Sequence, residues 1–483
     1  MSLKAKAFAA VRWTSVGVAV KTLLQILQIF ILARILAPTE VGVMSLALSI
    51  TMFIALFVDI GISSAIIHQQ AISQSERSSL YWLNVFVGLV LTVIFAVVSP
   101  WIAKFYHEPV LLGVLLIVSP YFLTFAIGQQ LRVMAEKELL FSRLVIIEVV
   151  SALAGFLSTV LMAARGYGAY SVAVGFLIGA VSFTSLGWRF LSLGWRPNFR
   201  FEFSEARKYL SYGLYVIGNN LVSSVNGAAD IFMGGRMLGL GALGGFGLPR
   251  DLMLNVSGVI NSVVTRVGLP LMAKSQGSAL GLRHVYLKTL RMTASVNIPI
   301  FLGVFAFTPE VVGIMFGEKW VESEPLMRLL ALWGMLRSFG QPVGSLIFAV
   351  GRADLAFKWN LCWILIIVPC FWYGLQHGAS GLAWAMLLLA VVGQIPTWRY
   401  LVHPLCGAGF SEYFAQLARP MLASVFTVSL VWMLLSSVTG IYARASLALL
   451  AGGCIYPIAS YFINRDWLLA MKDILLKSNR ASG

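Results

Sequence analysis

Apolar stretches of about 20 residues recur along the whole chain, and they constrain its fold more than any other feature. Hydrophobic residues make up 59% of the chain and charged residues only 11%, whereas soluble domains carry about 25% charged residues. In a bilayer the backbone must satisfy its own hydrogen bonds, and an α-helix does so within one stretch. The sequence therefore predicts an all-α polytopic membrane protein.

The apolar stretches predict about fourteen transmembrane helices, because a span needs roughly 20 residues. We place them at 10–36, 41–66, 79–103, 109–130, 144–165, 167–188, 209–232, 237–266, 291–316, 325–350, 355–376, 379–402, 413–438 and 441–463. The stretch at 237–266 is the least regular, since it is rich in glycine and contains Arg250 and Asp251. No gap between spans is long enough for a catalytic domain outside the membrane.

Lys and Arg gather in every second gap between the predicted spans, which sets the expected orientation. With the N-terminus in the cytoplasm, and with residues near a span end counted with the adjoining gap, 24 of the 35 Lys and Arg belong to cytoplasmic gaps, 7 to outer gaps and 4 to spans. Short cytoplasmic loops of membrane proteins carry such an excess. The formal net charge of +16 then faces anionic lipid. We expect both termini in the cytoplasm and no nucleic-acid partner.

The chain resembles itself at an offset of 202 residues. Gln28–Ala37 aligns with Asp230–Gly239, and a glycine, Gly42 or Gly244, follows eight residues after the arginine of each copy. This repeat predicts an N-terminal six-helix lobe at 1–206, a C-terminal six-helix lobe at 207–402, two further helices at 403–463 and a cytoplasmic amphipathic tail at 464–483. Transporters with parallel halves rock them around a central site.

Signals of enzyme chemistry are missing from the sequence. The five histidines are scattered, and the four cysteines lack the paired spacing of a metal site. No Gly-x-x-x-x-Gly-Lys-Ser/Thr phosphate loop occurs. We therefore expect a transporter with no catalytic residues, no metal and no cofactor.

Several short motifs resemble those of the Wzx-type polysaccharide-export flippases. They are Ala33-Arg34-Ile-Leu-Ala-Pro38-Thr-Glu40-Val-Gly42, Asp59-Ile-Gly-Ile-Ser-Ser-Ala, Asp230 with Gly235-Arg236-Met-Leu-Gly239, Phe246-Gly-Leu-Pro-Arg250-Asp and Gly351-Arg352. The resemblance runs from about residue 1 to residue 400, in the family's order and spacing. The family belongs to the multidrug/oligosaccharidyl-lipid/polysaccharide exporter superfamily.

The resemblance implies a fold, a substrate and a location. The fold has two lobes, with helices 1, 2, 7 and 8 lining a central cavity. The substrate is an oligosaccharide repeat unit on undecaprenyl diphosphate, which crosses from the cytoplasmic to the outer leaflet of a bacterial inner membrane for exopolysaccharide or O-antigen export. Membrane lipid and other polysaccharide assembly proteins are the further expected partners, and alternating access is the expected mechanism.

Basic residues inside spans are candidate contacts for a migrating diphosphate, because a charge in the hydrocarbon is costly and is kept mainly for function. Lys21, Arg250 and Arg337 lie in the first, eighth and tenth predicted spans. Snorkelling toward an interface is the alternative for Lys21, and a packed salt bridge is the alternative for Arg337. For Arg250 the alternative is an ion pair with Asp251, which helix geometry disfavours because adjacent residues point about 100° apart.

Polar residues form a dense patch in the seventh predicted span. Asn219, Ser223 and Asn226 recur at i, i+4 and i+7, so they share one helix face. In a cavity this face would bind sugar hydroxyls, whereas in a packed bundle it would hydrogen-bond a neighbouring helix.

Three acidic residues fall in or at the ends of predicted spans: Asp59, Glu148 and Asp230. Intramembrane acids relay protons in pumps, but they also form structural ion pairs. Both roles are open for these residues on the sequence alone.

Two other functions compete with a flippase. A cation-coupled multidrug or small-molecule exporter of the same superfamily would favour acidic residues in its cavity, whereas basic residues dominate here. A membrane-embedded glycan polymerase or ligase would need a large outer loop with catalytic Arg or His, and the longest outer gap, at 317–324, is far too short.

Overall fold

The computed structural model describes the chain except for residues 1–2, 60–65, 67–71, 200, 466 and 468–483. For residues 3–12, 203–217, 219, 259–260 and 262–267 it describes the backbone alone. Within the described part, every regular element is a helix and no β-strand occurs. The chain folds into two compact units.

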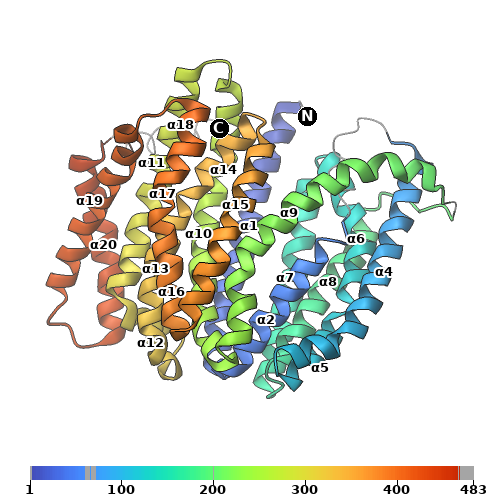
Figure 1. Cartoon of the computed structure of the whole chain (residues 1–483), viewed down its shortest axis with the longest axis horizontal. Coiled ribbons are helices and arrows are strands. Elements are labelled where there is room, and N and C mark those ends of the chain that lie inside the picture. The colour runs from blue at the N-terminus through green and yellow to red at the C-terminus, as the bar shows by residue number, and fades with distance from the viewer. Residues whose placement is uncertain (1–2, 60–65, 67–71, 200, 466, 468–483) are drawn as a thin grey trace. The chain divides into compact units, whose positions relative to one another are not determined.

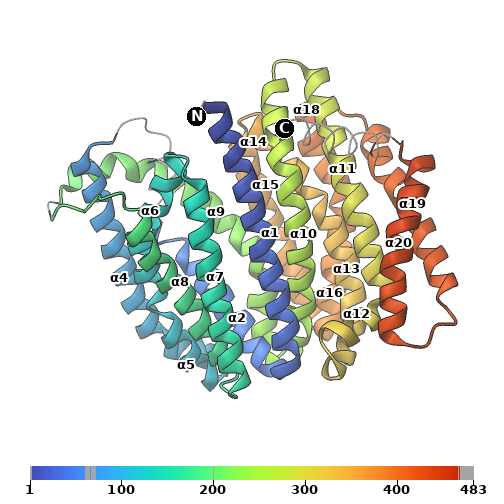
Figure 2. The same cartoon turned by 180° about the vertical axis from the view of Figure 1, so that it is seen from behind.

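Unit 1 comprises Met1–Leu248 and Trp359–Ala379. Its elements are α1 (Leu3–Ile35), α2 (Pro38–Ala55), α4 (Gln74–Phe105), α5 (Pro109–Val118), α6 (Tyr121–Lys137), α7 (Phe141–Ala164), α8 (Tyr170–Phe190), α9 (Phe203–Met237), the start of α10 (Leu240–Ser275) and most of α15 (Ala353–Leu375). Helices α4, α6, α7 and α8 lie side by side in both views, and α1 packs against α7 (Figure 1 and Figure 2).

Unit 2 comprises Pro249–Lys358 and Ser380–Gly483. After the rest of α10 come α11 (Ala279–Ala306), α12 (Thr308–Met315), a 3-10 helix (Glu318–Ser323), α13 (Glu324–Ser338), α14 (Gly340–Ala349), α16 (Gly378–Val392), α17 (Gln394–Pro396), a π-helical turn (Thr397–Val402), α18 (His403–Cys406), α19 (Phe410–Leu434) and α20 (Ile441–Ile463). Helix α11 packs against α13 and α19, and α19 packs against α20 (Figure 2).

The two glycines of the sequence repeat mark a close crossing within unit 1. A Cβ atom on Gly42 of α2 would lie 2.1 Å from the carbonyl oxygen of Leu240, and one on Gly244 of α10 would lie 1.8 Å from that of Pro38. Only glycine fits both positions, because the obstructing atoms belong to the backbone. The repeated Arg-to-Gly spacing therefore has a packing reason, and small residues allow such close approach of membrane helices.

Eleven helices within the described residues are long and apolar enough to cross a membrane. They confirm an all-α polytopic fold. The irregular stretch at 237–266 lies, from Leu240 onward, within one continuous helix, α10, although Pro249 and Pro270 are inside this helix. The stretch at 325–350 is instead two helices, α13 and α14, separated at Phe339. Pro342 accounts for this break, because it has no N–H for the carbonyl of Ser338 and its ring crowds that group.

Candidate functional site

Charged side chains from three helices meet inside unit 1. Lys21 Nζ on α1 lies 2.6 Å from Glu148 Oε2 on α7. Arg132 on α6 donates a hydrogen bond from Nη2 to the other carboxylate oxygen, Glu148 Oε1. The side chain of Glu148 is 11% exposed, whereas those of Lys21 and Arg132 are 30% and 38% exposed. One nearly buried carboxylate thus holds two more accessible cations.

A second carboxylate balances the charge of this cluster. Glu136, one turn after Arg132 on α6, lies 3.4 Å from the Nε of Arg132 through its Oε1. The ring of Phe183 on α8 lies 5.8 Å from the guanidinium carbon of Arg132, which is within cation–π range. Lys21, Arg132, Glu136 and Glu148 form what we call the unit 1 charge cluster, and together they carry no net formal charge.

Arg250 pairs with its neighbour on α10. Its Nη1 lies 3.0 Å from Asp251 Oδ1, and the Arg250 side chain is 8% exposed. The expectation that adjacent residues would not pair is wrong at this position, because the long arginine side chain bends across the angle between them. The ion pair that the sequence offered as the alternative therefore forms. A substrate contact for Arg250 stays a prediction.

Arg337 is exposed near the end of α13. Its guanidinium carbon lies 5.3 Å from the ring centre of Trp333, one turn earlier on the same helix. This cation–π contact orients the side chain along the helix surface. Whether Arg337 contacts a substrate stays a prediction.

The polar face of α9 hydrogen-bonds a neighbouring helix of unit 1. Asn226 donates from Nδ2 to the backbone oxygen of Asn360 on α15 at 2.9 Å, and Asn360 donates from Nδ2 to Ser223 Oγ at 3.0 Å. The Oδ1 atom of Asn226 is buried and makes no hydrogen bond. The side chain of Asn219 lies outside the described residues. Interhelical bonding, one of the two alternatives for this face, is therefore present for Ser223 and Asn226.

The three candidate acids occupy different surroundings. Glu148 is engaged by Lys21 and Arg132, as an ion-pair role requires. Asp230 is buried on α9 at 3% exposure. Asp59 is half-buried in the bend that follows α2. Proton coupling by any of them stays a prediction.

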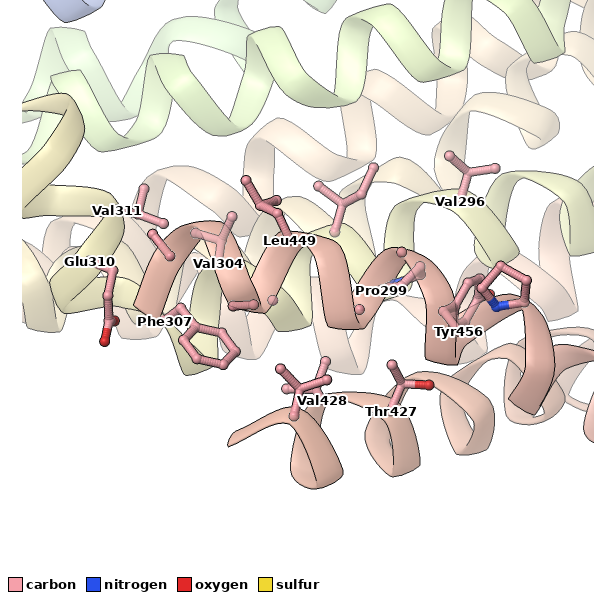
Figure 3. Close-up of a pocket in the computed structure, with 18 of the residues that line it drawn as sticks. Val296, Pro299, Val304, Phe307, Glu310, Val311, Thr427, Val428, Leu449 and Tyr456 are labelled. Atoms are coloured by element: carbon pink, nitrogen blue, oxygen red, sulfur yellow. The ribbon is translucent and has the colours of Figure 1, made fainter. Parts of the chain in front are cut away.

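An apolar cavity of about 630 Å³ lies within unit 2 between α11, α12, α19 and α20. In Figure 3, Glu310 and Phe307 lie at one end of it, and Tyr456 and Val296 lie at the other. Beside Glu310, Arg444 Nη1 approaches Glu310 Oε1 to 3.1 Å, and the Glu310 side chain is only 5% exposed. A buried ion pair thus lies at one end of the cavity.

Comparison with known proteins decides the family. A model of the polysaccharide biosynthesis protein family matches residues 31–325, which is more than half of the chain. The chain belongs to this family.

Individual relatives agree with the family over nearly the full length. WzxC of Escherichia coli (strain K12), a lipopolysaccharide biosynthesis protein, is 30% identical over 449 residues, which cover 93% of this chain and 90% of WzxC. TuaB of Bacillus subtilis (strain 168), a teichuronic acid biosynthesis protein, is 30% identical and covers 87% of each chain. These matches confirm the resemblance that the motifs indicated.

Two solved structures share the fold of this family member. The lipid II flippase MurJ in an inward closed conformation superposes with a TM-score of 0.79 at 15% identity, covering 94% of this chain and 99% of MurJ. An inward-facing multidrug transporter of the MATE family superposes with a TM-score of 0.63 at 12% identity, covering 79% and 94%. At these identities the likeness concerns the fold alone.

Sequence reasoning missed several of the charged and polar groups of this polysaccharide biosynthesis protein. Arg132 counted as a loop residue, although it reaches Glu148 inside the bundle. Arg444 counted as an outer-loop residue, and Glu310 was not considered. Asn360 was also missed. A polar residue within an apolar stretch was the available signal for Glu310 and Asn360.

Proposed function

We propose that the chain is a flippase that moves an oligosaccharide repeat unit, linked to undecaprenyl diphosphate, from the cytoplasmic to the outer leaflet of a bacterial inner membrane. The observation that carries this proposal is the match to WzxC over 93% of the chain at 30% identity, because WzxC is named for lipopolysaccharide biosynthesis. The MurJ-like fold supports it, since the same architecture serves another lipid flippase. Exopolysaccharide or O-antigen export is the resulting pathway, and alternating access is the proposed mechanism.

Cationic side chains of the transmembrane helices are the proposed contacts of the diphosphate. Lys21 is partly exposed and can reorient on its flexible side chain. Arg250 and Arg337 are proposed as further contacts with phosphate or sugar. Guanidinium groups suit phosphate because they donate two parallel hydrogen bonds.

The polar face of α9 is the proposed contact of the sugars. Ser223 and Asn226 already exchange hydrogen bonds with Asn360, and Asn219 continues the same helix face in sequence. Sugar hydroxyls both donate and accept hydrogen bonds, so they can replace or extend these contacts. Asp59, Glu148 and Asp230 are proposed as structural or coupling acids.

A cation-coupled drug exporter is the second candidate, and the MATE-like fold is compatible with it. The relatives that match along most of the chain are instead named for polysaccharide biosynthesis. For a flippase, partner proteins would come from the polysaccharide assembly machinery. Both termini would lie in the cytoplasm.

Deletion of the gene tests the proposal. We expect the deletion strain to lose surface polymer and to accumulate labelled lipid-linked oligosaccharide that a periplasmic glycosidase cannot reach. The wild-type protein should restore both. Normal polymer together with increased sensitivity to a dye such as rhodamine 6G would instead identify a drug exporter.

Complementation by variants tests the cations. Lys21→Ala and Arg250→Ala should each reduce polymer export while remaining at wild-type abundance in the membrane. Export at the wild-type level by both variants would contradict a role for these cations.

A further inference from the structure

The unit 1 charge cluster lies close to the turn that joins α6 and α7. Glu148 is seven residues into α7 and Arg132 is five residues before the end of α6, so at 1.5 Å per residue they lie about 10 Å and 8 Å from the turn that joins these helices. Lys21 is nine residues past Arg12, the nearest preceding charged residue in the sequence, or about 14 Å along the helix. Each headgroup layer is roughly 5–7 Å thick outside a hydrocarbon core of about 30 Å. With the turn between α6 and α7 at the membrane surface, the cluster would lie at the boundary between the headgroups and the hydrocarbon.

The two cations of the cluster are more exposed than the carboxylate between them. Lys21 and Arg132 are 30% and 38% exposed, whereas the carboxylate between them is 11% exposed. An anion that approaches from the accessible side would meet the two cations before it met Glu148. The two carboxylate oxygens each serve one cation, which is the arrangement that two oxygens of a phosphate would also adopt.

We propose that Lys21 and Arg132 form a binding site for the diphosphate of a lipid-linked substrate in the cytoplasmic leaflet, and that Glu148 is the resident counter-anion that this diphosphate displaces. The inference rests on the proposed function and deepens it by assigning an arrival site and a residue, Arg132, that holds the phosphate.

Such a site needs a resident anion while no diphosphate is bound. Two cations without a counter-charge at this depth would be strongly destabilising. Glu148, together with Glu136, neutralises them in the empty site. A carboxylate nevertheless binds such cations more weakly than a diphosphate, which carries more charge and more acceptor oxygens. The planar guanidinium of arginine can donate two parallel hydrogen bonds, and the ammonium of lysine sits on a flexible side chain. Both groups are common phosphate ligands.

The alternative is a purely structural ion-pair network that fastens α1 and α6 to α7. The two roles predict opposite effects of Glu148→Gln on anion binding. Glutamine keeps the size of the side chain and removes its charge. Loss of a competing anion should tighten diphosphate binding, whereas loss of a structural anchor should leave binding unchanged or weaken it.

The test is binding of farnesyl diphosphate, a sugar-free isoprenyl diphosphate, to the full-length protein in phosphatidylcholine nanodiscs. We expect Arg132→Gln and Lys21→Gln each to weaken binding about tenfold or more, because each removes a charge-assisted contact. We expect Glu148→Gln to tighten it by at least severalfold. Arg143→Gln, which removes an exposed positive charge from the same end of α7, is the matched control and should bind as the wild type does.

Contrary outcomes are well defined. Unchanged or weaker binding by Glu148→Gln, in a variant whose thermal unfolding shows that it is folded, overturns the displacement. Equal losses in Arg132→Gln and Arg143→Gln overturn the site, since they would reflect surface charge alone. Inorganic pyrophosphate is the second probe, and binding as tight as that of farnesyl diphosphate overturns the assignment to a lipid ligand.

These outcomes are separable from failure of the proposed function. If the binding pattern holds but the deletion strain presents lipid-linked oligosaccharide normally, the flippase proposal fails and the phosphate site stands. If the deletion strain accumulates the intermediate but the variants bind alike, only the site is contradicted.

Discussion

Glu148 on α7 accepts a hydrogen bond from Lys21 on α1, with 2.6 Å between Oε2 and Nζ, although the two residues are 127 positions apart in sequence. Arg132 of α6 binds the other oxygen of the same carboxylate. A single acidic side chain thus ties three helices of unit 1 together. It also fixes the positions of two cations near the turn that joins α6 and α7.

Removing this carboxylate should destabilise the protein. Glu148→Ala leaves Lys21 without its carboxylate partner and Arg132 with Glu136 alone. Breaking a buried pair costs about 3–5 kcal/mol, with the lower part of that range expected here because both cations are partly exposed. The measurement is the thermal unfolding midpoint in detergent. Glu136→Ala is the control, since Glu136 forms only an exposed pair with Arg132 and should cost less than about 1 kcal/mol. Equal shifts for the two variants would contradict this interpretation.

A methyl group at Gly42 should disrupt unit 1. In Gly42→Ala the new Cβ would lie 2.1 Å from the backbone oxygen of Leu240, so α2 and α10 would have to separate. We expect lower abundance in the membrane and a lower unfolding midpoint. Gly258→Ala, on α10 with open space around the position, should be tolerated. Wild-type stability of Gly42→Ala would show that the crossing is looser than the structure describes.

The buried ion pair beside the unit 2 cavity should matter more than an exposed one. Glu310 is 5% exposed and holds Arg444, so Glu310→Ala should destabilise the protein by about 3 kcal/mol. Asp354→Ala breaks the exposed pair with Arg352 and should cost less than about 1 kcal/mol. Urea or thermal unfolding of both variants compares the two effects, and a larger loss for Asp354→Ala would contradict the prediction.

Replacing Asn360 should affect polymer export more than stability. Asn360→Leu removes the hydrogen bond to Ser223, and interhelical bonds in membranes contribute about 0.6 kcal/mol on average. Stability should therefore change little, whereas export should fall if the α9 face binds sugars. Polymer export and membrane abundance are measured together. Normal export by this variant would leave the face with a packing role alone.

Local sequence patterns predicted the all-helical fold well. They predicted the contacts between individual residues of different helices poorly. Hydropathy located the spans because each apolar stretch must cross the bilayer by itself. It did not locate the break at Phe339, which depends on Pro342 within an otherwise apolar stretch. The motif glycines pointed to a repeat, but their reason, the backbone contact between Gly42 and Leu240, is a tertiary one.

The candidate site shows the same division. Lys21 and Glu148 were both singled out, because a charge in an apolar stretch is visible in sequence. Their pairing was not predictable, since it depends on how α1 and α7 pack. Arg132 was missed for a related reason: it is close to the end of α6, and its long side chain reaches inward to Glu148.

The most direct test of the central claim is transbilayer movement in proteoliposomes. Fluorescent lipid-linked oligosaccharide, isolated from the deletion strain, is reconstituted with the purified protein, and a membrane-impermeant quencher reports how much reaches the outer leaflet. The account predicts rapid exposure of nearly all of the label with the wild-type protein, and at least tenfold slower exposure with Lys21→Gln and Arg132→Gln. Exposure by the wild-type protein no faster than in protein-free vesicles would contradict the account.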